Sequence, residues 1–179
     1  MKKLVLIGGG GHCKSIIDTL KRLELYDEIV ITDPCFPSSR EILGVRIAGN
    51  DNALEELKRS GFNEAFSTVG SIKDTKLRQS LYQKANILGF NIPNIIDSSA
   101  CISQHAVMQE GIFVGKGAVI NADAYIDKMA IINTGAIVEH ECTIGEYTHI
   151  AVGAVLCGGV TIGNHSLVGA GATIIQGVE

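Results

Sequence analysis

A strict six-residue repeat governs the second half of the chain. From residue 102 to residue 174, every sixth position carries a large apolar side chain, thirteen times without a break. Two places earlier in each repeat lies a second regular position, which a small residue occupies in eleven of the thirteen repeats. Neither the 3.6-residue period of an α-helix nor the two-residue period of a strand explains this spacing. The repeat predicts a left-handed parallel β-helix, in which three hexapeptides complete one triangular coil.

Strands and helices alternate in the first half of the chain instead. Apolar runs predict strands at residues 3–7, 28–32, 64–69 and 92–96. Helical periodicity and capping signals predict helices at residues 13–24, from 50 or 51 to 59, and from Ser71 to 88. The segment 42–48 fits neither pattern. This alternation predicts a small open parallel sheet, so we expect a Rossmann-like α/β domain over residues 1–97 and an all-β domain, the β-helix, over residues 98–179.

Composition excludes several classes of function. The net charge of −4 and the isoelectric point near 5.7 argue against nucleic-acid binding, which needs basic patches. No apolar run is long enough to cross a membrane. The five cysteines are odd in number and form no CxxC pair, which indicates reduced thiols in a cytoplasmic protein.

A glycine-rich turn follows the first predicted strand and opens the first predicted helix. Gly8 and Gly10 match the dinucleotide-binding fingerprint, but Cys13 occupies the place of its third glycine, so the full motif fails. Such a turn still lets phosphates approach the backbone at a helix N-terminus, and Asp33 ends the second strand, where an acid often holds a ribose hydroxyl. The alternative is a tight turn with a helix-capping acid. His12 either contacts a phosphate or completes the turn.

His140 carries the strongest chemical signal. It lies two places after the interior residue Val138, so its side chain should point outward near a corner of the β-helix. A neutral imidazole can take a proton from an amine or hydroxyl that attacks a carbonyl. A flanking carboxylate, Glu139 or Glu141, could bind the other ring nitrogen and fix the tautomer, although adjacent side chains usually diverge. The alternative is a solvated polar corner.

Spacing predicts how the other polar residues lie around His140. His149 is nine residues further on, half of an eighteen-residue coil, and a six-residue edge of about 20 Å keeps the two histidines apart within one chain. Asn133 is sixteen residues before His149, nearly one coil, so these two should stack. This predicts a site between subunits, with His140 on one wall and Asn133 with His149 on the other. Gly158 offers a bare backbone N–H that could hold a thioester oxygen.

No metal is expected from the histidines. The carbonic anhydrases that are built on the same β-helix bind zinc through a set that includes a His-x4-His pair. The five histidines of this chain contain no pair at that spacing.

Four segments of the chain resemble the sugar acyltransferases of the NeuD and PglD type. They are IGGGGHCKSIID at 7–18, ILGV at 42–45, IINT at 131–134 and EHECTIG at 139–145. The resemblance covers essentially the whole chain. It implies a homotrimer with three active sites between the β-helices, with acetyl-CoA in the cleft between neighbours and the nucleotide of a sugar nucleotide on the N-terminal domain.

The resemblance also implies roles for individual residues. His140 would deprotonate the acceptor with support from Glu141. Asn133 would help to position substrate or cofactor, while His149 and the amide of Gly158 would hold the acetyl thioester. Substrate binding would fall to Gly8, Gly10, Gly11, His12 and Asp33.

Two features depart from the family pattern. The second strand ends in the single acid Asp33, followed by Pro34, where the nucleotide-sugar enzymes often carry two consecutive acids. The repeats also stop at Glu179, where the family continues for another coil or so, so we expect a β-helix truncated at its C-terminal end.

Three functions are therefore compatible with the sequence. The first is acetyl transfer from acetyl-CoA to the amino group of a nucleotide-linked amino sugar. The second is O-acetylation of sialic acid, and the third is a non-catalytic trimeric scaffold that binds a nucleotide sugar. The sequence leaves open the acceptor sugar, its nucleotide and its pathway.

Overall fold

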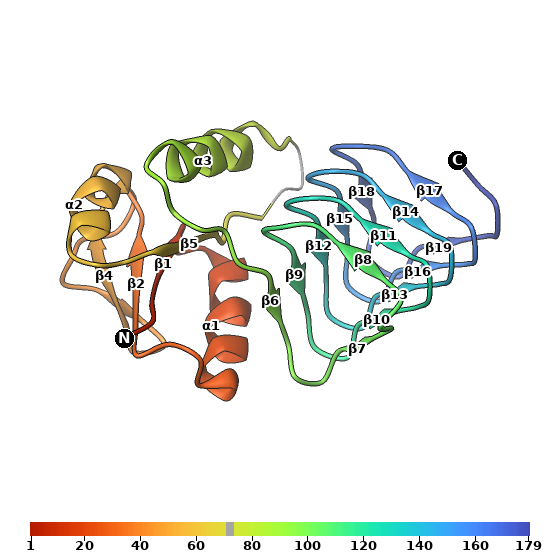
Figure 1. Cartoon of the computed structure of the whole chain (residues 1–179), viewed down its shortest axis with the longest axis horizontal. Coiled ribbons are helices and arrows are strands. Elements are labelled where there is room, and N and C mark those ends of the chain that lie inside the picture. Colours follow the sequence, from red (N-terminus) through yellow and green to blue (C-terminus); the bar gives the residue numbers. More distant parts are fainter. Residues whose placement is uncertain (71–73) are drawn as a thin grey trace. The chain divides into compact units, whose positions relative to one another are not determined.

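The computed structural model describes residues 1–70 and 74–179, which fall into two compact units. Met1–Gly70 and Lys76–Pro93 form the first unit, and Asn94–Glu179 make up the body of the second. Figure 1 labels most of the helices and strands of both units.

The first unit is built on a five-stranded sheet of order β3-β4-β2-β1-β5. Its strands are β1 (Lys3–Ile7), β2 (Glu28–Thr32), β3 (Glu41–Ile42), β4 (Val45–Gly49) and β5 (Glu64–Ser67). The pairings β4-β2, β2-β1 and β1-β5 are parallel, as predicted. The inner strand β1 is apolar and fully buried from Leu4 onward, as expected of a parallel strand covered on both faces.

One edge of this sheet departs from the predicted all-parallel arrangement. β3 pairs with β4 in antiparallel fashion, so the sheet is mixed. Leu43 and Gly44 join the two strands with φ values of 47° and 73°, and two successive positive φ values are those of a tight hairpin turn. The segment 42–48 fitted no pattern because a reversal of the chain lies inside it.

The first two helices of the first unit follow the predicted segments with small shifts of their ends, whereas the third begins only at Lys76 and not near residue 71, because residues 74 and 75 are not helical. The helical elements are α1 (Gly11–Leu23), the 3₁₀ turn η1 (Asp51–Ala53), α2 (Leu54–Arg59) and α3 (Lys76–Ile87). Asn50 caps η1 by accepting a hydrogen bond from the Asn52 N–H at 2.9 Å. Ser71, the expected cap of the last helix, lies outside the described residues. In the part of the chain described, no helix is both long and apolar enough to cross a membrane.

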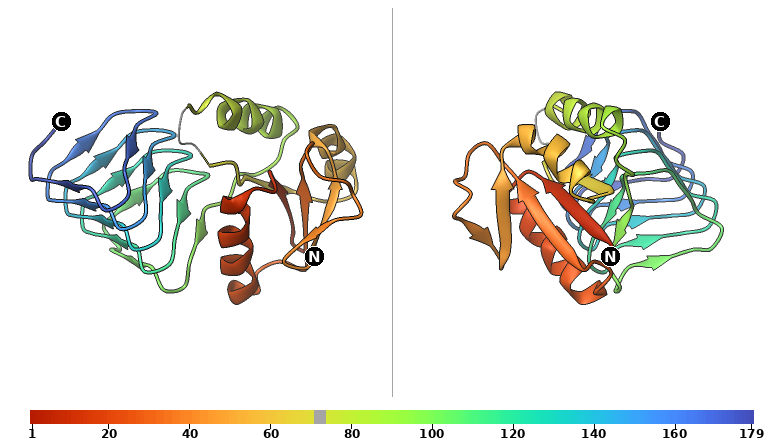
Figure 2. Two further views of the ribbon diagram at one scale, coloured as in Figure 1. Left: turned by 180° about the vertical axis from the view of Figure 1, so that it is seen from behind. Right: turned by 60° about the vertical axis from the view of Figure 1, so that its left-hand side comes forward.

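The second unit is the predicted left-handed parallel β-helix. Its short strands are β6 (Ile95–Ile96), β7 (Cys101–Ile102), β8 (Val107–Met108), β9 (Phe113–Val114), β10 (Val119–Ile120), β11 (Tyr125–Ile126), β12 (Ile131–Ile132), β13 (Ile137–Val138), β14 (Thr143–Ile144), β15 (His149–Ile150), β16 (Val155–Leu156), β17 (Thr161–Ile162), β18 (Leu167–Val168) and β19 (Thr173–Ile174). They form three parallel sheets in which each strand pairs with the strand eighteen residues further on, as Ile120 does with Val138. Figure 2 shows the coils stacked one above the next. The predicted strand over 92–96 is shorter and belongs here, because β6 pairs with β9.

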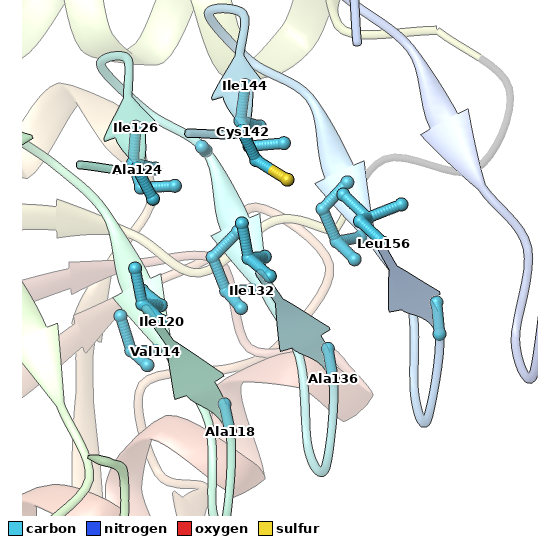
Figure 3. Packing of buried hydrophobic residues seen from close by; sticks show 14 of the residues in the cluster. Val114, Ala118, Ile120, Ala124, Ile126, Ile132, Ala136, Cys142, Ile144 and Leu156 are labelled. Carbon is cyan, nitrogen blue, oxygen red and sulfur yellow. The ribbon is translucent and has the colours of Figure 1, made fainter. Parts of the chain in front are cut away.

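Both repeating columns of the sequence form the core of the β-helix. The large residues from Val114 to Leu156 are at most 1 % exposed and fill the interior between the three sheets. Figure 3 shows Ile120, Ile126 and Ile132 pointing into this space, with alanines at the neighbouring small positions. Because large and small side chains recur at the same positions, successive coils have the same cross-section and their interior side chains pack without voids.

A third position of the repeat lies at the corners of the triangle. Every sixth residue from 111 to 177 has a positive φ, between 56° and 72°. Seven of these twelve residues are glycines, and the other five are Asp123, Met129, Glu141, Tyr147 and His165. A left-handed conformation costs a residue with a side chain about 1–2 kcal/mol. One of the five, Glu141, is a predicted site residue.

Candidate active site

His140 and Glu141 lie together at the corner between β13 and β14. The Nδ1 atom of His140 is 3.1 Å from the Oε2 atom of Glu141, and their side chains are 60 % and 69 % exposed. Adjacent side chains diverge on an extended backbone, but Glu141 has a φ of 60°. The left-handed turn lets both side chains share one side. Since the carboxylate can only accept, it favours the tautomer with hydrogen on Nδ1 and a lone pair on Nε2.

Gly158 lies directly against the imidazole of His140. A Cβ atom added at Gly158 would sit 2.5 Å from Cε1 and 2.6 Å from Nε2 of the ring. The next residue, Gly159, donates its N–H to the carbonyl of His140 at 2.9 Å. The ring therefore needs a residue without a side chain beneath it. The sequence analysis missed this contact, although a spacing of eighteen residues places position 158 one coil after position 140.

Asn133 and His149 form the second polar pair of the β-helix. The Nδ2 atom of Asn133 is 3.0 Å from the Nε2 atom of His149, which confirms the predicted stacking of the two residues. Asn133 follows β12, and His149 begins β15, the next strand of the same sheet. In each coil the sheet of β12 and β15 is followed by the sheet of β13 and β16, and His140 comes just after the end of β13. One face of the triangle separates the two groups along the chain.

In the first unit, Asp33 is engaged with the backbone of the glycine-rich turn. Its Oδ2 atom accepts the N–H of Gly9 at 2.6 Å, and its Oδ1 atom accepts the N–H of Cys35 at 2.7 Å. Gly8 has a φ of 109°, and a Cβ there would lie 2.7 Å from the Val69 side chain. The carboxylate of Asp33 therefore holds the turn in place, and the turn can adopt this shape because Gly8 has no side chain.

The turn leads into the uncapped start of α1. No side chain caps the helix at Gly10, and its first turn contains no acidic residue, so its N–H groups suit an anion. His12 lies partly buried in that first turn. Cys13, at the place of the third fingerprint glycine, is fully buried, and burial raises the pKa of its thiol to about 11. The thiol is therefore protonated at neutral pH and acts as an apolar side chain.

A cavity of about 370 Å³ opens over this turn. Gly9, Gly10 and Gly11 line it together with two cations, Lys14 and Arg40, and one anion, Glu41. The guanidinium of Arg40 lies over the ring of Phe36, 4.2 Å from its centre. Backbone N–H groups and cations on one cavity can hold phosphate groups. Sequence reasoning missed Lys14 and Arg40, because nothing in the pattern brings residue 40 next to the turn.

Metal-binding side chains do not converge in the part of the molecule that the structure describes. Among those residues, no three His, Cys, Asp or Glu side chains form a group that could hold a metal ion.

Comparisons with known proteins agree along most of the chain. Residues 3–85 match the family described as PglD N-terminal domain, and residues 141–176 match the family described as bacterial transferase hexapeptide (six repeats). No curated protein matches the sequence significantly.

Solved structures resemble both units. A mutant of perosamine N-acetyltransferase from Caulobacter crescentus, in complex with CoA and GDP-perosamine, is 36 % identical, with a TM-score of 0.83. The match covers 99 % of this chain and 90 % of that one. The acetyltransferase domain of PglB from Neisseria gonorrhoeae, in complex with acetyl coenzyme A, is 28 % identical, with a TM-score of 0.82 and coverage of 98 % and 94 %.

Proposed function

The chain is an acyltransferase of the PglD and NeuD type, and from that premise we propose that it transfers the acetyl group of acetyl-CoA to the amino group of a nucleotide-linked amino sugar. The Caulobacter crescentus relative supports an amine acceptor, because it is an N-acetyltransferase in complex with CoA and GDP-perosamine. The relative from Neisseria gonorrhoeae, in complex with acetyl coenzyme A, supports the donor.

The arrangement of His140 is the observation that carries the proposal. With hydrogen on Nδ1 directed at Glu141, the Nε2 atom carries the lone pair that can accept a proton. The acceptor amine attacks the thioester carbonyl and forms the new C–N bond while His140 removes its proton. As the C–S bond breaks, the imidazolium can return that proton to the leaving thiolate. Glu141 stabilises the charged imidazolium between the two steps.

The glycine-rich turn binds the nucleotide of the acceptor in this proposal. The phosphates lie at the start of α1, where Gly10, Gly11 and His12 present backbone N–H groups and Lys14 adds positive charge. Asp33 serves by fixing the turn through the N–H of Gly9, and Gly8 allows the turn its shape. The first unit thus holds the nucleotide, and the β-helix, which begins at Asn94 rather than at the expected residue 98, carries out the transfer.

The active site is completed by a second chain. We assign His140 and the neighbouring N–H of Gly158 of one subunit to one wall of the site, with Asn133 and His149 of the adjacent subunit on the other, in a homotrimer. Support comes from the separation of His140 from the Asn133–His149 pair by a face of the triangle. The five cysteines are free thiols, as expected of the cytoplasm, where acetyl transfer would take place.

The chemistry of the product tests the proposed function. We expect the protein, given acetyl-CoA and a GDP- or UDP-linked 4-amino sugar, to release free CoA thiol and to form a product whose acetyl group resists mild alkali. Amides survive such treatment and esters do not. Sialic acid, offered in parallel, should give no product. An alkali-labile acetyl group on sialic acid would instead support the O-acetyltransferase, and transfer to neither acceptor would contradict both.

Mixed assemblies test the site between subunits. The variants His140→Ala and His149→Ala should each be nearly inactive alone. Co-expressed in equal amounts, they should recover about a quarter of the wild-type activity, because random assembly pairs two intact walls at roughly one interface in four. Activity that merely equals the mean of the separate variants, or a monomer by light scattering, would place the whole site within one chain.

A further inference from the structure

A second cavity lies at the carboxyl ends of the parallel strands of the first unit. It measures about 140 Å³, and its apolar walls include Ile7, Val69, Leu77 and Leu81. Two carboxylates, Asp33 and Asp51, are the charged side chains along its lining. This volume is well below the roughly 300–1,000 Å³ of sites for drug-sized ligands, so the cavity suits one flat ring system rather than a whole nucleotide.

The two carboxylates differ in what they can still bind. Both oxygens of Asp33 accept backbone N–H groups, at 2.6 and 2.7 Å. Asp51 accepts one hydrogen bond, from the hydroxyl of the buried Thr32 to Oδ1 at 3.2 Å. Within the described part of the chain, its Oδ2 atom has no partner. A carboxylate has about four acceptor positions, so Asp51 is oriented by Thr32 and retains most of its capacity.

This cavity and the larger one beyond the glycine-rich turn differ in the charge of the side chains that line them. Gly8 lines the cavity with the two carboxylates, whereas Gly9 to Gly11 line the cavity that holds Lys14, Arg40 and Glu41, two cations against one anion. Phosphates would be repelled by Asp33 and Asp51 and attracted by the two cations. Leu77 is 55 % exposed although it borders the smaller cavity, which leaves an apolar surface for a ring to cover.

We propose that the smaller cavity binds the nucleobase of the acceptor and that Asp51 selects guanine. The inference deepens the proposed function and rests on it for the presence of a nucleotide. Guanine carries two adjacent donors, N1–H and the N2 amino group, which match the two oxygens of one carboxylate. Uracil presents its N3–H between two carbonyl oxygens, which would face the carboxylate with like charge. Apolar side chains above and below the ring complete this mode of base recognition.

Binding of free nucleotides to the full chain, without acetyl-CoA, tests this assignment. By calorimetry, GDP should bind more tightly than IDP, which lacks the N2 amino group, by about tenfold, and more tightly than UDP by at least that factor. Asp51→Asn should weaken GDP binding by about 10–100-fold and bring the ratio of GDP to IDP affinity near one, because an amide cannot accept both donors. Glu55→Gln, which makes the same change of charge on the surface of α2, should leave all three affinities unchanged.

Each contrary outcome has a definite meaning. Equal affinities for GDP and UDP in the wild type would overturn the proposal, as would an Asp51→Asn variant that keeps the preference for GDP over IDP. If that variant does not fold, the comparison of the three nucleotides on the wild type decides alone. Failure of acetyl transfer with the preference for GDP intact would reject only the proposed function, and acetyl transfer without that preference would reject only the role of Asp51.

Discussion

Replacement of His140 by alanine is expected to lower kcat by about 10²–10⁴-fold, which is the usual contribution of a positioned general base. The side chain is 60 % exposed and lies outside the core of the β-helix, so its loss should leave the fold unchanged. The KM for acetyl-CoA should change little, because the base acts on the acceptor amine. Steady-state kinetics with both substrates varied would measure this result, alongside thermal unfolding to verify the fold.

A second histidine of the same β-helix provides the matched control. His105 is exposed and contacts Gln104 and Ser103, far along the chain from the proposed site. His105→Ala should therefore keep wild-type kinetics. A His140→Ala variant within threefold of wild type would remove His140 from the role of base. Equal losses in the two variants would point to a general effect on the protein instead.

The β-helix could be predicted in full because one constraint is repeated in every coil. Each interior position, such as Ile120 or Ile132, faces the same cross-section, so the sequence must satisfy one packing rule thirteen times. The same period also predicts which residues of successive coils lie next to each other. It correctly stacked Asn133 on His149, which lie 3.0 Å apart. In a periodic fold the spacing of two residues in the sequence thus predicts their distance in space, whereas in an irregular fold it does not.

Local exceptions to the repeat could not be predicted in the same way. The left-handed corner position is hidden because residues such as Glu141 and Tyr147 interrupt its glycines. The hydrophobic pattern says nothing about this backbone conformation, which depends on the hydrogen bonds of neighbouring coils. The N–H of Glu141 donates to the carbonyl of Ala122 at 3.0 Å. That bond helps to hold Glu141 in its costly conformation, and the conformation brings its carboxylate to His140.

In the first unit, prediction from the sequence failed for a different reason. Its strands were predicted where buried apolar runs exist, but the antiparallel pairing of β3 with β4 depends on a two-residue turn that gives no periodic signal. Asp33 was expected near a ligand from its place at the end of β2. Its carboxylate instead accepts the N–H of Gly9. A motif places a residue near a site, whereas only the three-dimensional contacts reveal whether that residue is still available to bind.

Gly158→Ala is expected to lower kcat by about 100-fold, although it adds a single methyl group. The new Cβ would lie 2.5 Å from Cε1 and 2.6 Å from Nε2 of His140, closer than side-chain atoms approach one another. The imidazole must then move off its position beside Glu141, and a displacement of about 1 Å at a reacting group can cost 10²-fold in rate. Gly158 does not have a positive φ, so alanine causes no backbone strain there, and the free energy of unfolding should change little.

Two comparisons separate displacement of the imidazole from other effects of the added methyl group. Gly169→Ala is the matched control, because a Cβ at Gly169 meets nothing within 4 Å and its φ is not positive either; it should keep wild-type kcat. In the double variant with His140→Ala, the loss caused by Gly158→Ala should largely disappear, since residues that act as one unit have non-additive effects. Fully additive losses would show that alanine at position 158 acts on the thioester side of the site, through the N–H assigned to it, rather than through the position of the base.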